Sequence, residues 1–155
     1  MNAADALAKQ RYYEDVSIGD EYEEFQQPTP EHVATFLNND GNRGPDRMGR
    51  FTDASVARSE GLSRPIIPGT MSTAIITRIV TDWMGPLGRI VNLEVSFRRP
   101  VMHNDRLRCH AMVTDAGNDT PDGEPGLVTL DVTLENDRGE KPVQGTATVE
   151  LPRRG

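Results

Sequence analysis

The sequence predicts an α+β fold in which one antiparallel sheet wraps around a long helix. Between Met71 and Trp83, hydrophobic residues recur at three- and four-residue steps, which is the spacing of one helix face. After Gly85 the pattern changes to an alternation with a period of two, which is typical of strands. Shorter helical segments precede the long helix, and all but one of the expected strands follow it. We therefore expect these strands to form a single sheet that covers the helix.

The length and composition indicate one globular domain. The chain has 155 residues, of which 35% are hydrophobic and 26% are charged, and this balance suits a folded chain with a modest core. We expect a flexible N-terminal segment over residues 1–11 and a single domain over residues 12–155. No apolar run approaches the roughly 20 residues that span a bilayer, and no signal peptide is recognisable, so we expect a cytoplasmic protein without a membrane partner.

The charge and cysteine content exclude several classes of protein. The net charge of -7 comes from acids spread along the chain, so no basic stripe is available for nucleic acid. Cys109 is the single cysteine and lies in an alternating segment, which predicts a buried thiol. No Cys/His cluster has the spacing of a zinc site, so we expect no metal and no cofactor.

The first half of the domain is expected to contain a short strand and two short helices. Pro30 fits the first position of a helix that Thr29 caps. Thr52 or Asp53 can cap the second helix, and Gly61 ends it. The polar, glycine-containing segment 38–50 separates the helices and is expected to form a loop, and long loops are often functional. The expected strand covers residues 21–25, and the expected helices cover residues 30–37 and 54–59.

We expect the segment 65–69 to be extended and to lead into the long helix, and we expect this helix to be largely buried and to end at Gly85 and Pro86. Four strands follow it, and the turn at 136–139 joins the last two as a hairpin. A sheet of this kind leaves free edges that a second copy commonly covers, so we expect a dimer. The predicted strands cover residues 89–99, 106–116, 127–137 and 141–151.

Two stretches resemble one known family. FTDASVARSEGLSRPIIPGTM begins at Phe51 and VSFRRPVMHNDRL begins at Val95. In this order and spacing they resemble the MaoC-like family of hotdog proteins, which includes R-specific enoyl-CoA hydratases and 3-hydroxyacyl dehydratases. The resemblance covers roughly residues 13–151. It implies a hotdog fold, an acyl thioester of CoA or acyl carrier protein as substrate, and domains that work in pairs, as homodimers or as heterodimers with another hotdog chain.

The resemblance also implies where the active site lies. In active family members a D-x-N-P-x-H loop supplies an Asp and a His that activate water, and an amide at the start of the central helix stabilises the thioester enolate. This chemistry needs a base, an acid and donors to the carbonyl oxygen. By resemblance, Asp40 and Asn42 take the positions of the family Asp and Asn, and Gly69 and Thr70 supply the oxyanion amides. A simple helix cap is the alternative role for Gly69 and Thr70.

The histidine of the family motif is absent. Five positions after Asp40 stands Pro45, and two positions before Asp53, the acid that follows the family His, stands Phe51. His32 is expected to be solvated at a helix start, and His110 to be packed within a strand or at its edge. Four residues remain as possible pocket residues: Asp46; Phe51; Pro68, which stands where relatives commonly carry a His; and His103, which stands where relatives usually carry a Pro.

Three functions fit this pattern. The first is an enoyl-thioester hydratase or 3-hydroxyacyl dehydratase with Asp40 as base, alone or assisted by Asp46 or Asn42. The second is a non-catalytic subunit that binds the acyl group while a partner chain supplies the Asp and His. The third is a thioesterase, which needs a carboxylate on or near the central helix. Asp82 is the only acid within that helix and lies far from Gly69, so the thioesterase ranks below the other two.

Overall fold

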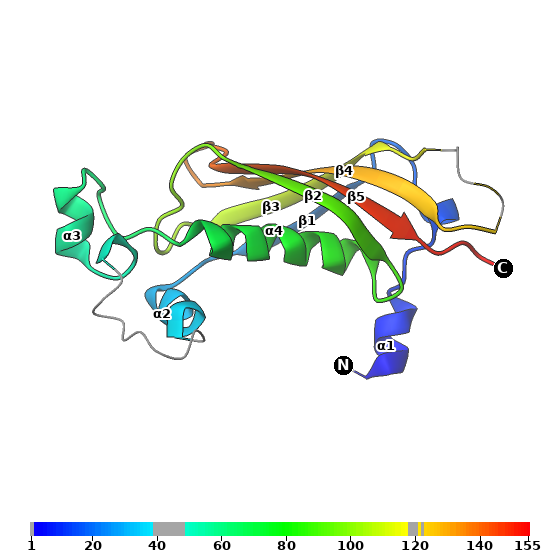
Figure 1. Cartoon of the computed structure of the whole chain (residues 1–155), viewed down its shortest axis with the longest axis horizontal. Helices are drawn as coiled ribbons and strands as arrows, with labels where there is room; N and C mark the ends of the chain where they lie inside the picture. The colour runs from blue at the N-terminus through cyan, green and yellow to red at the C-terminus, as the bar shows by residue number, and fades with distance from the viewer. Residues whose placement is uncertain (1, 39–48, 118–120, 122) are drawn as a thin grey trace.

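The computed structural model describes residues 2–38, 49–117, 121 and 123–155, and these form a sheet curved over one long helix (Figure 1). The short helices α2 and α3 lie beyond one end of the long helix α4, and α1 lies near its other end. The helical elements are α1 (Ala3–Ala8), η1 (Tyr13–Asp15), α2 (Pro30–Asn38), η3 (Gly49–Phe51), α3 (Ala54–Ser59) and α4 (Gly69–Met84). The strands are β1 (Glu21–Gln26), β2 (Arg89–Phe97), β3 (Leu107–Asp115), β4 (Gly126–Glu135) and β5 (Val143–Leu151).

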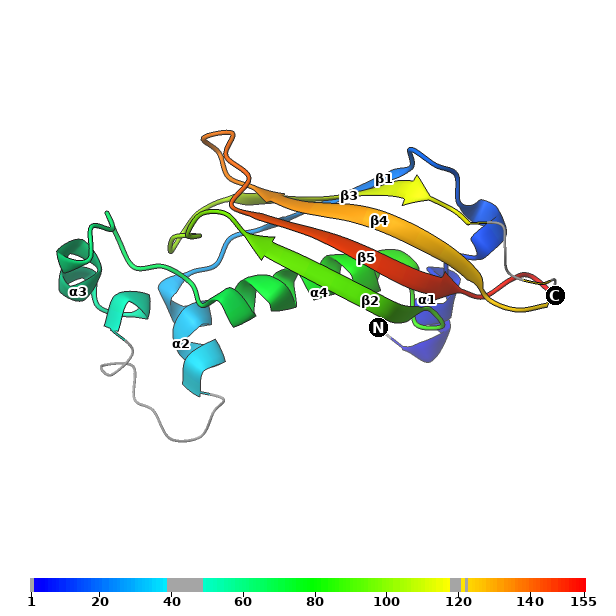
Figure 2. The same ribbon diagram turned by 45° about the horizontal axis from the view of Figure 1, so that its top comes forward.

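The five strands are antiparallel and lie in the order β1-β3-β4-β5-β2. The strand that follows α4 therefore pairs with the last strand of the chain, and Phe97 lies opposite Val143. Figure 2 shows the sheet passing over α4, with β1 and β2 along its two edges. Both edge strands present large apolar side chains to solvent.

The core lies between α4 and the concave face of the sheet. Ile76, Ile79 and Trp83 are buried on the helix face that meets the sheet. Gly145 in β5 allows a close approach, because an added Cβ would lie 2.9 Å from the backbone oxygen of Glu94 and 3.6 Å from the Ile76 side chain. The main buried residues of the sheet are Leu107, Ala111, Val113, Val128, Leu130, Val132, Leu134, Ala147, Val149 and Leu151.

The expectation that α4 is largely buried is wrong for one side of the helix. Ala74, Arg78 and Thr81 are exposed, because the sheet covers α4 from one side only. The amphipathic spacing of the apolar residues is the spacing of a helix with a single buried face. The other face of α4 is available to border cavities.

The short elements match their predicted caps. Asp53 caps α3, since its carboxylate accepts hydrogen bonds from the amides of Ser55 and Val56 at 2.8 and 3.2 Å. Gly61 follows α3 with a φ of 86°, a conformation that favours glycine. Within the described ranges, no helix combines the length and the hydropathy needed to cross a membrane.

Candidate functional site

The N-terminus of α4 is open. Pro68 is the N-cap residue and its side chain makes no capping hydrogen bond. Its carbonyl accepts from the amides of Met71 and Ser72 at 3.0 and 3.2 Å, whereas Gly69 and Thr70 are exposed helical residues at the start of the first turn. The first amides of a helix have no intrahelical partner and carry the positive end of the helix dipole. This end of α4 is therefore suited to bind an anionic or polarised oxygen.

Two neighbouring segments position this helix start. The amide of Ile67 donates to the Val101 carbonyl at 2.8 Å, and the amide of His103 donates to the Pro65 carbonyl at 2.9 Å. On the other side, the amide of Ile66 donates to the Arg50 carbonyl at 3.1 Å. The segment 65–67 is thus held between the turn that follows β2 and the short helix η3.

The ring of Phe97 forms a wall beside Gly69. A Cβ added to Gly69 would lie 3.5 Å from a ring carbon of Phe97, which is an ordinary van der Waals contact. Phe97 ends the edge strand β2 and is 55% exposed in the single chain. The start of α4 is therefore bordered by an aromatic ring on the side of the free sheet edge.

An apolar cavity of about 290 Å³ lies on the other side of the same helix end. Its apolar lining comes from Phe36 of α2 and from Met71, Ala74 and Ile75 of α4. The rest of the lining is Gln26, Gln27, Pro28, His32 and Arg78. Met71 stands two residues after Gly69, so the cavity begins within one turn of the open amides. A polar helix end beside an apolar cavity suits a ligand with a polar head and an apolar chain.

His103 is buried close to the segment that leads into α4. The residue is 5% exposed, and its Nε2 atom is buried without a hydrogen-bond partner. Burial lowers the pKa of the imidazole below its ordinary value of 6.5, and the nearby backbone carbonyls of Phe51 and Ile66 oppose this effect only in part. His103 is therefore a neutral, buried side chain near neutral pH.

Phe51 and Pro68 border the same region. Phe51 ends η3 and is partly buried, with the guanidinium of Arg50 5.4 Å from its ring centroid. Pro68 is buried at the helix cap. A phenyl ring cannot accept or deliver a proton, so Phe51 does not replace the acid–base role of the family His.

The remaining assigned residues of the loop, Asp40, Asn42 and Asp46, lie outside the described residues. Their roles stay predictions from the resemblance.

The other two histidines and the cysteine lie in α2 and β3. His32 is exposed, and its Nδ1 accepts from the amide of Thr29 at 3.3 Å near the start of α2. His110 lies 2.9 Å from a carboxylate oxygen of Glu21 across the β1–β3 pair. Cys109 is buried, and burial raises the pKa of its thiol to about 12. Among the described residues, no group of three or more His, Cys, Asp or Glu side chains is placed to hold a metal.

Asp82 lies close to the far end of α4. It stands thirteen positions after Gly69 along the helix, which corresponds to roughly 20 Å. Its carboxylate lies 3.5 Å from the guanidinium of Arg78. A carboxylate at this distance cannot act on a carbonyl bound at the Gly69 amides, which counts against a thioesterase.

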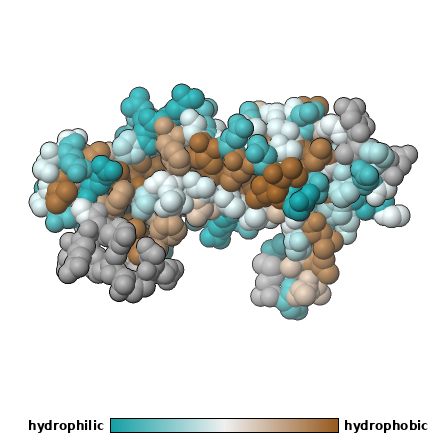
Figure 3. All heavy atoms as spheres, viewed as in Figure 1, coloured by the Kyte–Doolittle hydropathy of each residue, from teal (hydrophilic) through white to brown (hydrophobic). Residues whose placement is uncertain are grey.

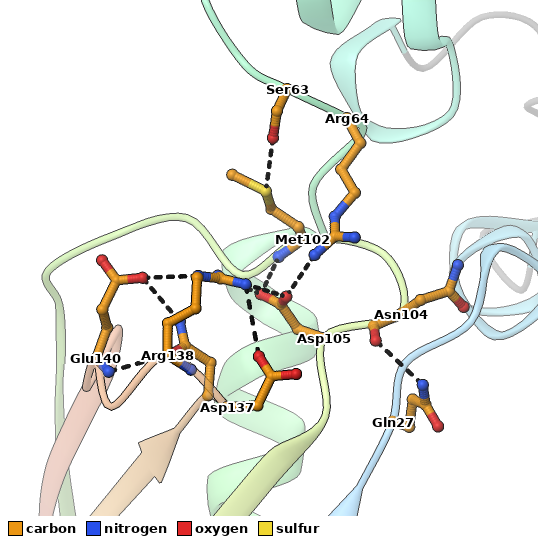
Figure 4. Close-up of polar contacts among 10 residues, drawn as sticks. Gln27, Ser63, Arg64, Met102, Asn104, Asp105, Asp137, Arg138 and Glu140 are labelled. Atoms are coloured by element: carbon orange, nitrogen blue, oxygen red, sulfur yellow. Dashed lines mark hydrogen bonds and ion pairs between the residues drawn. The ribbon is translucent and has the colours of Figure 1, made fainter.

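A buried carboxylate near the start of α4 was not among the predicted site residues. The Asp105 side chain is 1% exposed and lies 2.8 Å from the Arg64 guanidinium and 3.2 Å from that of Arg138 (Figure 4). Its second oxygen accepts from the amide of Met102 at 3.0 Å. Asp105 belongs to the second family-like stretch, but Arg138 lies in the β4–β5 turn. No local pattern in the sequence connects these residues.

Taken together, the curved sheet and the central helix define a hotdog domain, and the open N-terminus of this helix lies close to an apolar cavity. The model of the MaoC-like domain matches residues 51–136, which is more than half of the chain. The chain belongs to this family. A search among curated proteins found no match.

Solved structures show the same fold. R-hydratase PhaJ1 from Pseudomonas aeruginosa superposes with a TM-score of 0.76 at 23% identity, over 92% of this chain and 86% of that one. A MaoC-like dehydratase from Rhodospirillum rubrum gives a TM-score of 0.76 at 22% identity, over 94% and 99%. The ChsH1–ChsH2 complex from Mycobacterium tuberculosis gives 0.71 at 21% identity, over 88% and 98%. At these identities the comparison establishes the hotdog fold.

Proposed function

We propose that this protein binds acyl thioesters and catalyses the reversible hydration of 2-enoyl thioesters to 3-hydroxyacyl thioesters. The observation that carries the proposal is the open start of α4, where the exposed residues Gly69 and Thr70 stand beside an apolar cavity. The amides are proposed to bind the thioester oxygen, and the cavity to take the acyl chain. Membership of the MaoC-like family and the likeness to an R-hydratase support this assignment.

The proposed chemistry uses the helix end at the point where charge develops. A base removes a proton from water, the oxygen of the water bonds to C3, and the negative charge moves onto the thioester oxygen as an enolate. Delivery of a proton to C2 then completes the addition. Backbone amides at the positive end of a helix stabilise such an oxyanion, and one such donor is typically worth about 10²–10³ in rate.

Asp40 is the proposed base, with Asn42 or Asp46 as possible assistants that hold the water. The test is loss of the enoyl-thioester absorbance when the protein is mixed with crotonyl-CoA and longer enoyl-CoA substrates. We expect Asp40→Asn to abolish most of this activity, because an amide cannot take up the proton. An Asp40→Asn variant as active as the wild type would remove Asp40 as the base.

We also propose that the protein works as a pair of hotdog domains joined along β2. Val91 and Phe97 of this edge strand are 48% and 55% exposed, and Leu87 just before it is 53% exposed. Hydrophobic residues form a band over β2 on the face shown in Figure 3. An edge strand with exposed apolar side chains favours pairing with another strand along its free edge. Light scattering is expected to show dimers for the wild type and monomers for Val91→Lys, and an unchanged mass would contradict this interface.

The second candidate function is a non-catalytic subunit of a heteromeric dehydratase. It is favoured by the absence of the family His, since the two positions that the resemblance offers for it hold Pro45 and Phe51, and by the likeness to a complex of two chains, ChsH1–ChsH2. In this case a second hotdog chain with a complete D-x-N-P-x-H loop is expected to co-purify, and the mixture alone is expected to hydrate enoyl-CoA. A homodimer that hydrates crotonyl-CoA unaided would rule out this alternative.

A further inference from the structure

We propose that Asp105 and Arg64 are positioning residues of the proposed reaction, and that their ion pair holds the start of α4 so that its open amides face the thioester oxygen. This inference rests on the proposed function and adds two residues to it. Arg64 stands five residues before Gly69, and Asp105 lies in the turn between β2 and β3, residues 98–106. In this role both side chains act through the backbone of α4 and not on the substrate itself.

The segment that leads into α4 is bound along its length to the β2–β3 turn. Backbone hydrogen bonds and an isolated antiparallel bridge join residues 65–67 to residues 101–103 of this turn. The last of these bonds, from the amide of Ile67 to the Val101 carbonyl, lies two residues before Gly69. The intervening residue is Pro68, whose ring restricts its backbone φ. The place of the Gly69 amide therefore depends on the place of the β2–β3 turn.

The carboxylate of Asp105 closes this turn. Its Oδ2 accepts a hydrogen bond from the amide of Met102 at 3.0 Å, and the amide of Asp105 donates to the Met102 carbonyl at 3.1 Å. Between these two residues, Asn104 has a φ of 65°, a left-handed conformation that is uncommon outside glycine. A side chain that binds the backbone three residues earlier favours one conformation of such a turn.

The same carboxylate connects the turn to the chain ahead of α4. Its Oδ1 lies 2.8 Å from Nη2 of Arg64, which extends toward it from the segment before the helix (Figure 4). The Asp105 side chain is 1% exposed, so solvent and salt screen this contact less than a contact between two surface charges. A hydrogen bond between ionised groups is also stronger than a neutral one. The ion pair therefore adds a side-chain anchor to the backbone bonds of residues 65–67.

Arg138 binds the same carboxylate but connects it to a different element. Its Nη1 lies 3.2 Å from Oδ1 of Asp105, and its other ion pairs join it to Glu140 at 2.9 Å and Asp137 at 3.6 Å in its own β4–β5 turn. The side chains of Arg64 and Arg138 are 43% and 44% exposed. The two arginines thus share a partner and an exposure, whereas Arg64 anchors the start of α4 and Arg138 anchors the sheet.

The expected effect on the reaction comes from the alignment of the amides. Donors to an oxyanion act on charge that develops in the transition state, so their direction affects kcat more than binding of the substrate. A misplacement of about 1 Å in a catalytic group can cost about 10²-fold in rate. Loss of the Arg64 anchor leaves the backbone bonds of residues 65–67 in place. We therefore expect a smaller loss of rate, of about tenfold.

The test compares Arg64→Ala with Arg138→Ala. Asp105→Ala is unsuitable, because it removes the partner of both arginines and of the Met102 amide at once and is expected to impair folding. Each arginine variant leaves Asp105 with one guanidinium, so both should lose several degrees of melting temperature. Arg64→Ala is expected to lower kcat for crotonyl-CoA hydration about tenfold and to change KM less than about twofold. Arg138→Ala is expected to keep kcat within about twofold of the wild type.

An infrared measurement reports the alignment without turnover. Butyryl-CoA has no double bond to hydrate, and hydrogen bonds from the α4 amides are expected to lower the frequency of its thioester carbonyl band on binding. At saturating ligand, Arg64→Ala is expected to lose at least about half of this shift, and Arg138→Ala to retain it. A loss of stability alone does not change the carbonyl frequency of the bound ligand.

The outcomes separate this inference from the proposed function. If the wild type hydrates crotonyl-CoA or shifts the butyryl-CoA band, but the two arginine variants change equally or not at all, the positioning role is wrong and the thioester function stands. If the wild type neither hydrates crotonyl-CoA nor shifts the butyryl-CoA band, the proposed function fails and the positioning role fails with it.

Discussion

The two ends of α4 differ in whether other groups of the chain bind their free backbone groups. At the C-terminal end, the carbonyl of Met84 accepts a hydrogen bond from the Gln10 side chain at 2.8 Å, and the carbonyl of Trp83 accepts one from Arg11. The Arg11 guanidinium also lies 4.8 Å from the ring centroid of Trp83. At the N-terminal end, Pro68 provides no side-chain cap and Gly69 is exposed.

This difference shows which end of the helix is structural and which is suited to bind a ligand. The negative end of the dipole meets the cation Arg11, and its carbonyls have partners within the chain. The positive end has no acidic residue in its first turn. Its amides are therefore left for an outside group, which agrees with the proposed thioester oxygen.

The strongest test of this comparison removes one amide from the open end. Proline is tolerated at the first helical position, and Pro68 has the extended backbone that a following proline requires, with φ of -62° and ψ of 147°. Gly69→Pro is expected to lower kcat/KM for enoyl-CoA hydration by about 10²–10³ while the fold is retained. Gly69→Ala, which keeps the amide and places its Cβ in ordinary contact with Phe97, is the control. Equal activity of the two variants would contradict the oxyanion role.

The C-terminal end of α4 is tested by measuring the stability of the fold rather than the activity. Gln10 is 8% exposed and also accepts from the amide of Leu87 at 2.7 Å. Gln10→Ala removes the partner of the Met84 carbonyl in a buried contact and that of the Leu87 amide in a partly buried one, so we expect the free energy of unfolding to fall by about 2–3 kcal/mol. Lys9→Ala, at the exposed neighbouring position, is expected to change it by less than about 0.5 kcal/mol. Denaturant unfolding measures both, and equal effects would mean that Gln10 does not seal the helix end.

The smallest expected effect is a pH dependence near the open end. Because burial lowers the pKa of His103 below 6.5, the unfolded chain takes up a proton at a higher pH than the folded chain. The resulting contribution leaves stability unchanged above pH 6.5 and lowers it as the pH falls from 6.5 toward the lowered pKa. His103→Gln should therefore lose less thermal stability than the wild type on acidification over this range. His32→Gln, at an exposed site, should follow the wild type, and parallel curves for all three proteins would exclude this role of His103.

Many features of the fold follow from local patterns in the sequence. The predicted body of α3 and the caps at Asp53 and Gly61 are confirmed, as are the four strands that follow α4. These elements depend on residues that are close in sequence, such as a carboxylate two or three positions before the amides that it caps. Periodicity and capping therefore predict them well.

The site was predicted less completely. Gly69 was placed correctly at the open helix end, but no pattern indicated that Arg138 from the β4–β5 turn meets Arg64 at a buried Asp105. The expected burial of α4 was too high. The spacing of apolar residues predicts that one face of a helix is buried, but it does not indicate how much of the opposite face a sheet covers. The family assignment of Asp40 depends on the resemblance alone.

By itself, the sequence determined the types of the main helices and strands and placed the ends of the strands to within one or two residues, because these depend on interactions among neighbouring residues. Only the tertiary structure decided that β2 pairs with β5, that Phe97 borders Gly69 and that Arg64 and Arg138 meet at Asp105. Such contacts join residues that are tens of positions apart, and a local pattern of side chains contains no information about which distant segment becomes its neighbour.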